Sequence, residues 1–196
     1  MDTCFKPLEH KPFLKYLLAA LAGFFLMGCS SAHKNGHMHE SSNDPVFYGV
    51  AIMYPTEGNN VSGTVVFSES FGRVRVQADV RGLDPNGVHG FHIHEWGDCR
   101  AKDAMSAGGH YNPEGHPHAG PDVKERHAGD LGNLKADATG RAQLNMTISN
   151  LSIAGRLNPI LGRSVIIHEE PDDLISQPTG GAGDRVACGV IGAATR

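Results

Sequence analysis

The stretch G-F-H-I-H-E-W at residues 90–96 contains two histidines, His92 and His94, separated by a single residue. In an extended strand alternate side chains point to the same face, so both imidazole rings are expected on one side of a sheet. Histidines that gather in clusters indicate metal coordination more often than histidines scattered through loops. The stretch therefore predicts a strand that carries two metal ligands.

Further candidate ligands lie in two other parts of the chain. A histidine-rich segment follows the first stretch, and a separate histidine, His168, comes directly after the apolar run at residues 165–167. The candidates in the histidine-rich segment are His110, His116, His118, His127 and Asp130. This distribution is typical of a metal site that a fold assembles from separate segments.

The composition indicates a loop-rich globular β protein. The chain has 196 residues, of which 25 are Gly and 12 are His, with 40% hydrophobic and 19% charged residues. This length fits one domain with an additional N-terminal segment, and the apolar content excludes a disordered chain. The formal net charge of −4 gives no indication of a nucleic-acid partner.

Short alternating segments predict eight strands and no helix. The third is the clearest, because Val74, Val76, Ala78 and Val80 alternate with polar residues. The expected strands are residues 46–54, 61–68, 73–80, 88–95, 133–138, 142–149, 163–169 and 187–193. They predict an all-β antiparallel sandwich or barrel. The long connections at 97–130 and 172–184 are expected to be functional loops.

The start of the chain resembles a bacterial lipoprotein signal. Three lysines precede an apolar run at residues 16–27, which is too short for a comfortable membrane span and ends before Gly28 and Cys29. We expect residues 1–28 to be removed and Cys29 to be lipidated; an ordinary cleaved signal peptide is the alternative. Either signal exports the chain to an oxidising compartment. The predicted boundaries are a signal at 1–28, a tether at 29–45 and a domain at 46–196.

The tether is polar and rich in histidine. Its side chains at His33, His37, Met38 and His39 are ligand types that suit copper, so it could capture this metal. The alternative is a solvated linker without a metal.

Two cysteines remain for the domain once Cys4 is removed with the signal and Cys29 is lipidated. A bridge between Cys99 and Cys188 would close a loop of about 90 residues and stabilise the fold by roughly 4–5 kcal/mol in the chain-entropy model. Two free thiols are the alternative.

The ligand types allow two different metals. Four imidazoles suit Cu(II), and three imidazoles with one carboxylate suit zinc. His116 competes with His118 for a zinc position. Without His116, seven candidates remain, and they could fill eight positions if one histidine were shared between the metals. Spacing alone does not select this arrangement.

Six motifs resemble the copper–zinc superoxide dismutase family. They are G-F-H-I-H-E at 90–95, S-A-G-G-H-Y-N-P at 106–113, H-A-G-P at 118–121, R-H-A-G-D-L-G-N at 126–133, V-I-I-H-E at 165–169 and D-R-V-A-C-G-V-I-G at 184–192. The resemblance covers about residues 46–193. It implies an eight-stranded Greek-key β-barrel or sandwich of immunoglobulin-like type, one copper ion and one zinc ion per chain, and conversion of superoxide to oxygen and hydrogen peroxide by copper redox cycling.

The resemblance also implies a role for each matching residue. The copper ligands would be His92, His94, His110 and His168, and the zinc ligands His110, His118, His127 and Asp130. The shared His110 and the anion-guiding Arg185 would be the catalytic residues. Asp172 would tie a copper-ligand histidine to a zinc-ligand histidine. His89 falls on the opposite strand face and is expected to be structural.

The position of Cys99 directly after Asp98, the N-terminal signal and the stretch at 176–183 resemble the bacterial periplasmic branch of the family. This branch implies a periplasmic protein, either anchored through lipid or soluble after cleavage. A homodimer is consistent with the family, but the subunit arrangement does not carry over between branches. A copper-delivery or copper-storage protein on the same fold is the alternative function, although such a protein would not need Arg185.

Overall fold

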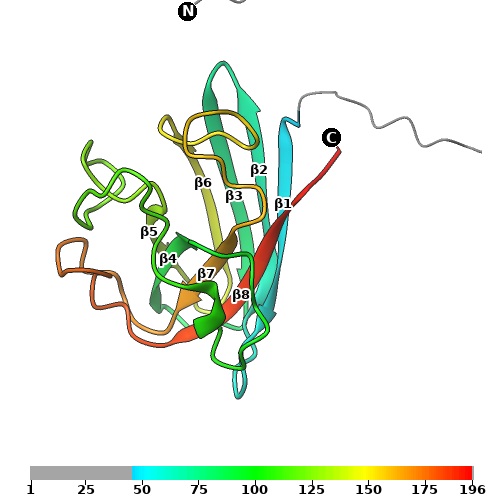
Figure 1. The fold of residues 1–196 in the computed structure, drawn as a ribbon. Coiled ribbons are helices and arrows are strands. Elements are labelled where there is room, and N and C mark those ends of the chain that lie inside the picture. Colours follow the sequence, from blue (N-terminus) through cyan, green and yellow to red (C-terminus); the bar gives the residue numbers. More distant parts are fainter. Residues whose placement is uncertain (1–45, 196) are drawn as a thin grey trace, which may run out of the picture. The chain divides into compact units, whose positions relative to one another are not determined.

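The computed structural model describes residues 46–195, and its regular structure is an antiparallel barrel of eight strands (Figure 1). The strands are β1 (Tyr48–Pro55), β2 (Ser62–Ser70), β3 (Arg73–Arg81), β4 (Val88–His94), β5 (Asp130–Lys135), β6 (Ala142–Ile148), β7 (Ser164–His168) and β8 (Arg185–Ala193). The all-β prediction is confirmed, and each of the eight expected strands is present.

Most strand ends shift by one to three residues from the expected ranges, and three differences bear on the argument. Pro55 is the last residue of β1 rather than the first residue beyond it, since proline is tolerated at strand ends. A 3₁₀ helix, η1 (Met105–Ala107), lies where no helix was expected. The strand expected at 133 begins at Asp130, so this candidate ligand sits at the start of a strand.

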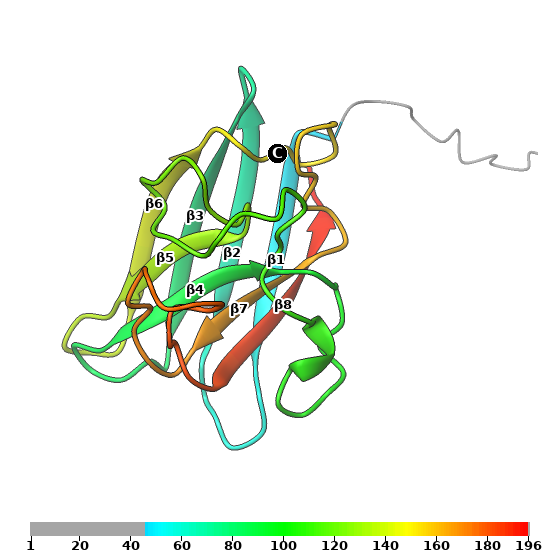
Figure 2. The same ribbon diagram turned by 60° about the vertical axis from the view of Figure 1, so that its left-hand side comes forward.

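The strands form one nearly closed sheet in the order β5-β4-β7-β8-β1-β2-β3-β6. The connections from β3 to β4 and from β6 to β7 cross between the two halves of the barrel, as in a Greek key (Figure 2). The alternation expected in β3 is present, since its four apolar side chains are buried and its arginines are exposed. The barrel interior is filled by these and similar side chains from all strands.

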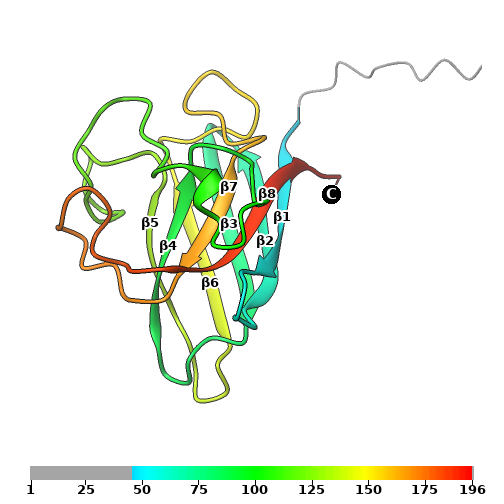
Figure 3. The ribbon, with the colours of Figure 1, turned by 60° about the horizontal axis from the view of Figure 1, so that its bottom comes forward.

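Strands β4 and β7 are buried on both faces. One face of β4 turns Phe91 and Ile93 into the barrel core, and the other turns His92 and His94 outward. The segments before β5 and before β8 project from this side of the barrel (Figures 1 and 3). These long loops cover the outward face, which explains why histidines there are buried.

In the part of the chain from 46 to 195, no helix is long and apolar enough to span a membrane. The signal predicted at 1–28, the lipidation site Cys29 and the tether histidines His33, His37 and His39 lie outside the described residues. The predicted domain boundaries therefore stay predictions.

Candidate metal centre

The pairing of β4 with β7 brings three of the predicted ligands onto one surface. His92 lies opposite Ile166 and His94 opposite Ser164, while His168 ends β7 beside Arg185 of β8. The register of β4 against β5 shifts between Gly90 and His92, and this bulge turns the chain where the ligands begin. Tertiary pairing thus joins residues 74 positions apart, whose ring nitrogens, His94 Nε2 and His168 Nε2, are separated by 3.4 Å.

The first cluster of four buried side chains consists of His92, His94, His110 and His168. One ring nitrogen of each strand histidine is held by a protein partner. His94 Nδ1 lies 3.0 Å from the carbonyl oxygen of Gly108, and His168 Nδ1 lies 3.3 Å from that of Gly183. The Nε2 atoms of both residues are therefore left to face the centre of the cluster.

The second cluster consists of His110, His118, His127 and Asp130. Asp130 Oδ1 lies 2.9 Å from His110 Nδ1, 3.0 Å from His118 Nδ1 and 3.2 Å from His127 Nδ1. The other carboxylate oxygen, Oδ2, accepts backbone hydrogen bonds from Ala119 and His127, which fix the carboxylate orientation. One oxygen is thus anchored by the backbone while the other converges with three imidazoles.

Asp172 connects the two clusters. Its Oδ2 lies 2.8 Å from His92 Nε2, and its Oδ1 lies 2.9 Å from His118 Nε2. Asn133 holds Asp172 in place through a pair of backbone hydrogen bonds, both of 2.8 Å. The carboxylate therefore leaves the Nδ1 atoms of both histidines as the available ligand atoms.

Four buried side-chain nitrogens have no hydrogen-bond partner within residues 46–195, and three of them belong to these clusters. These three are His92 Nδ1, His110 Nε2 and His118 Nδ1. His118 Nδ1 is close to Asp130 Oδ1, but the contact lacks hydrogen-bond geometry. Unsatisfied buried nitrogens are costly in a folded protein, and a metal ion would satisfy them.

The second cluster fits zinc. Tetrahedral zinc with ligand distances of about 2.0–2.2 Å separates neighbouring ligand atoms by about 3.3–3.6 Å. The Nδ1 atoms of His110 and His127 are 3.4 Å apart, and Asp130 Oδ1 lies slightly nearer to each imidazole. Three imidazoles and one carboxylate are also an ordinary zinc ligand set, whereas the four imidazoles of the first cluster suit copper.

Burial keeps the histidines of the first cluster neutral, as metal ligands must be. It lowers the pKa of His110 to about 4 and that of His168 to about 3, because a charged imidazole loses its hydration there. Burial likewise lowers the pKa of His92 and His94.

His118 behaves differently because it lies between two carboxylates. Burial disfavours its charge, but the Asp130 carboxylate, 3.0 Å from its Nδ1, and the hydrogen bond with Asp172 outweigh burial and raise its pKa to about 9. The pKa values of both carboxyl groups are lowered well below their usual range, because the hydrogen bonds from the histidines outweigh burial. This negative charge attracts a cation to the second cluster.

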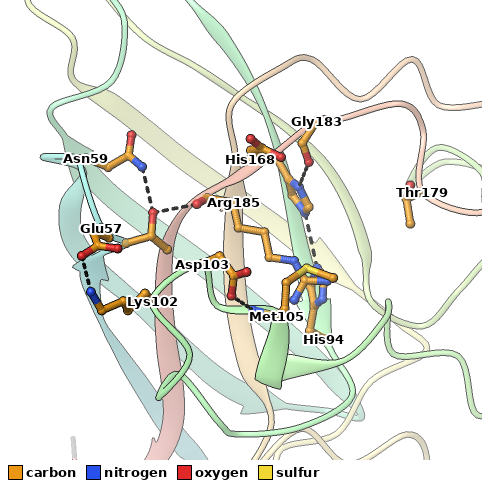
Figure 4. Close-up of a pocket in the computed structure, with 12 residues that line it drawn as sticks. Glu57, Asn59, His94, Lys102, Asp103, Met105, His168, Thr179, Gly183 and Arg185 are labelled. Atoms are coloured by element: carbon orange, nitrogen blue, oxygen red, sulfur yellow. Dashed lines mark hydrogen bonds and ion pairs between the residues drawn. The ribbon is translucent and has the colours of Figure 1, made fainter.

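Arg185 borders a cavity of about 790 Å³ that His94 and His168 also line (Figure 4). Its Nη1 donates to the carbonyl oxygen of Ala104 and its Nη2 to that of Gly108, both at 2.7 Å. Neutral carbonyls hold the guanidinium without cancelling its charge. The arginine can therefore attract an anion into a cavity that is open to solvent and ends at two histidines of the first cluster.

Lys102 also lines the cavity, but its charge is compensated. Its ammonium pairs with the carboxylate of Glu57 at the rim of the cavity (Figure 4). Asp103 and Asp184 also line the cavity. The positive field at the cavity therefore depends on Arg185.

The predicted disulfide is confirmed. Cys99 and Cys188 are bonded, with Cα atoms 5.8 Å apart and a sequence separation of 89 residues. Both cysteines pack against Ala104 and Ala107, which flank Met105 in the η1 turn. The bridge thus fixes the turn whose neighbouring carbonyls hold Arg185.

Two other histidines lie outside the clusters. His116 is fixed in its loop through backbone hydrogen bonds with the Asn112 side chain, so the structure favours His118 in the competition between them. His89 is buried, and its Nδ1 lies 3.0 Å from the carbonyl oxygen of His168, in agreement with a structural role.

Sequence reasoning missed the groups that orient the ligands. Asn133 and the carbonyl of Gly108 carry no recognisable signal in the sequence. Gly180 could have been suspected from the Gly-rich stretch before Arg185, and its φ of +67° requires glycine. A Cβ atom at Gly180 would lie 1.9 Å from Asp172 Oδ1, so the loop approaches the connecting carboxylate too closely for any side chain.

Comparison with known proteins agrees with this geometry. The model of the family described as copper/zinc superoxide dismutase (SODC) matches residues 61–191, which is more than half of the chain. The chain belongs to the copper/zinc superoxide dismutase family. A relative in Paramecium bursaria Chlorella virus 1, described as superoxide dismutase [Cu-Zn], is 45% identical over 138 residues, which cover 67% of this chain and 73% of the relative.

A solved structure of the clock protein EA4 is also similar, with a TM-score of 0.70 and 37% identity. The similarity covers 77% of this chain and 97% of that protein. The dismutase described here is therefore an oxidoreductase that converts superoxide to oxygen and hydrogen peroxide and uses copper and zinc.

Proposed function

We propose that each cluster holds one metal ion of the dismutase. Copper is bound by His92, His94, His110 and His168, and zinc by His110, His118, His127 and Asp130. The observation that carries this assignment is the set of buried nitrogens, His92 Nδ1, His110 Nε2 and His118 Nδ1, that lack partners among residues 46–195 and lie within the two clusters. His110 has one nitrogen toward each cluster, which makes it the shared ligand.

The protein side chains bind the two metals, orient the ligand histidines and attract the substrate anion. Bound copper supplies a one-electron redox couple, and zinc is a fixed positive charge next to it. Asp172 sets the tautomers of His92 and His118, so that their Nδ1 atoms face the metals. The loops exclude water from all but the cavity side, where His94 and His168 meet the substrate anion.

Arg185 is proposed as the residue that brings superoxide into the cavity. The protein carries a net charge of −4, so a local positive field must oppose the repulsion of an anion. The guanidinium keeps its charge, because it is bonded to carbonyl oxygens and lies in the cavity wall.

Replacement of Arg185 by alanine tests this role. Arg185→Ala should retain both metals but lower kcat/KM by about tenfold or more and flatten its dependence on salt, because focusing of charge contributes 10–10³ to such encounter rates. Arg75→Ala is the matched control. It removes the same charge from an exposed arginine of β3 that bonds Asn145 and does not line the cavity. Equal effects of the two substitutions would remove Arg185 from substrate capture.

The metal assignment is tested with the full chain loaded with copper and zinc. Fast, cyanide-sensitive consumption of superoxide with one copper and one zinc per chain supports it. Two bound metals without turnover would favour copper delivery or storage. Single replacements, His118→Ala for zinc and His94→Ala for copper, should each remove the assigned metal first, as measured by elemental analysis.

We also propose that the protein is exported to a bacterial periplasm and anchored there through Cys29, with the histidine-rich tether capturing copper. The lipobox-like sequence supports this location. Labelling with radioactive lipid in the Cys29→Ser variant tests the anchor, and copper binding in a variant lacking residues 33–39 tests the tether.

A homodimer is proposed through the outer face of β1 and β8. Three large apolar side chains are exposed on this face: Ile52 at 46%, Val190 at 43% and Trp96 at 61%. Trp96 belongs to it because the next residue, Gly97, lies against Val190. The register of β1 and β8 places Ile52 opposite Val190. Contiguous apolar surface of this kind commonly marks an interface. A Val190→Glu variant should sediment as a monomer where the unmodified chain sediments as a dimer.

A further inference from the structure

Met105 is an exposed thioether at the mouth of the cavity. Its side chain is 61% exposed, and it lines the same cavity as His94, His168 and Arg185. Figure 4 shows Met105 together with His94 and Arg185 around one opening. None of the roles assigned above uses this sulfur.

The backbone around Met105 is held firmly beside the anion-guiding arginine. Its N–H is bonded to Asp103 Oδ1, and its carbonyl accepts from Gly108. Arg185 binds the carbonyls of Ala104, just before Met105, and of Gly108, which ends the turn. Because Ala104 and Ala107 are buried against the disulfide, the backbone of Met105 is held at the cavity that its side chain lines.

Dismutation releases hydrogen peroxide into this cavity. A thioether reacts with peroxide when a sulfur lone pair attacks one oxygen and the O–O bond breaks. The second oxygen takes a proton and leaves as water, so the sulfur loses two electrons and peroxide gains them. The products are methionine sulfoxide and water, and the enzyme's own reaction supplies the oxidant.

We propose that Met105 is a modification site at which the product of the enzyme reversibly lowers its activity. The sulfoxide oxygen is a strong hydrogen-bond acceptor close to Arg185. A guanidinium has five N–H donors. Two of those of Arg185 bind the carbonyls, and an anion needs the remaining ones. An acceptor fixed in the cavity competes with superoxide for them, and methionine sulfoxide reductases can reverse the change.

The chain contains two other described methionines that serve as internal controls. Met53 is 1% exposed in the barrel core, and Met146 is partly buried on β6. Both are more buried than Met105 and do not line the cavity. They therefore report how fast less exposed thioethers of the same chain are oxidised, and the rate at Met105 is compared with theirs.

The experiment uses the full copper- and zinc-loaded chain under a steady supply of superoxide. Peptide mass spectrometry should show an added oxygen on the Met105 peptide before the Met53 and Met146 peptides. Activity should fall about two- to tenfold, the range over which one competing hydrogen bond of ordinary strength changes an equilibrium. Sulfoxide reductase should restore the activity as the added oxygen disappears, and Met105→Leu should lack this restorable part of the loss.

Three results would overturn the proposal. They are oxidation of Met146 as fast as that of Met105, complete oxidation of Met105 with unchanged activity, and a restorable loss that persists in Met105→Leu. The proposal rests on dismutase activity as the peroxide source. Added hydrogen peroxide on the metal-free chain separates the two questions, since Met105 should then still be oxidised first even if turnover is absent.

Discussion

At the scale of single residues, the metal centre depends on which nitrogen of each histidine is occupied by the protein. Asp172 is central because one carboxylate holds His92 and His118, which belong to different clusters. Its own position depends on Asn133. The orientation of the ligands can therefore be changed by substituting Asp172, while the ligand residues themselves stay the same.

Asp172→Asn should weaken binding of both metals while the ligands remain intact. An amide cannot accept two imidazole N–H groups through two equivalent oxygens, and loss of such a partner typically costs about 10–100-fold in metal affinity. Competition with a chelator measures this affinity. Asp173→Asn is the control, because this neighbouring carboxylate is exposed and bonds Ser176. Similar affinities for the two variants would contradict the connecting role.

At the scale of elements, two loops and one short helix complete the metal centre that the strands carry in part. The loop before β8 approaches Asp172 at Gly180, and the turn η1 presents carbonyls to Arg185 and His94. Both segments depend on long-range contacts, because neither has a sheet partner of its own.

Gly180→Ala should displace Asp172 and lower metal affinity. The new Cβ would overlap Asp172 Oδ1, and the positive φ adds about 1–2 kcal/mol of strain. Gly115→Ala matches the strain, since its φ is +71°, but it meets no atom within 4 Å. Denaturant titration should show the cost of backbone strain in both variants and a further loss of stability from the overlap in Gly180→Ala. Only Gly180→Ala should lose metal in a chelator competition. If both variants kept their metals equally well, the loop at Gly180 would be able to move away from Asp172.

Removal of the disulfide should reduce both stability and substrate capture. The double variant Cys99→Ser and Cys188→Ser opens a loop with a sequence separation of 89 residues, which corresponds to about 4–5 kcal/mol in the chain-entropy model. It also frees the η1 turn, so Arg185 loses its fixed carbonyl partners. Urea unfolding and the salt dependence of kcat/KM measure the two effects. An unchanged salt dependence would show that the turn holds Arg185 without the bridge.

At the scale of the whole molecule, the outer face of the barrel and the loops that cover it bury several imidazoles and keep them neutral. The folded pKa values of His110 and His168, about 4 and about 3, lie below their ordinary value of 6.5. Between pH 6.5 and these folded pKa values, both imidazoles are therefore protonated in the unfolded chain but neutral in the folded chain. Stability from these groups is full above pH 6.5 and is lost as the pH falls through the folded pKa values.

The metal-free protein should therefore show a urea midpoint that declines from pH 6.5 toward pH 4. His118 has the opposite sign, since its pKa is raised to about 9 and its contribution is lost as the pH rises from 6.5 through that value. Replacement of His168 by glutamine should flatten the acid decline. A midpoint that is constant over this range would contradict the neutral state of the buried imidazoles.

The sequence by itself determined the class of fold and the pair of cysteines, and its resemblance to the family indicated the candidate metal ligands. Alternation with a period of two is a local property, so β3 and β4 could be recognised without knowing their neighbours. The six motifs carried every ligand of the two clusters in order along the chain, and the disulfide followed because two cysteines were left for the domain.

The tertiary structure decided how these residues are brought together and which groups hold them in place. The register between β4 and β7 joins His94 to His168, and strand pairing over such separations depends on the whole sheet. The start of β5 at Asp130 was missed because a metal-binding loop gives no alternating pattern. The carbonyl partners of Arg185 and the position of Met105 follow from loop packing against the barrel, since backbone carbonyls are identical in every residue and leave no mark on the sequence.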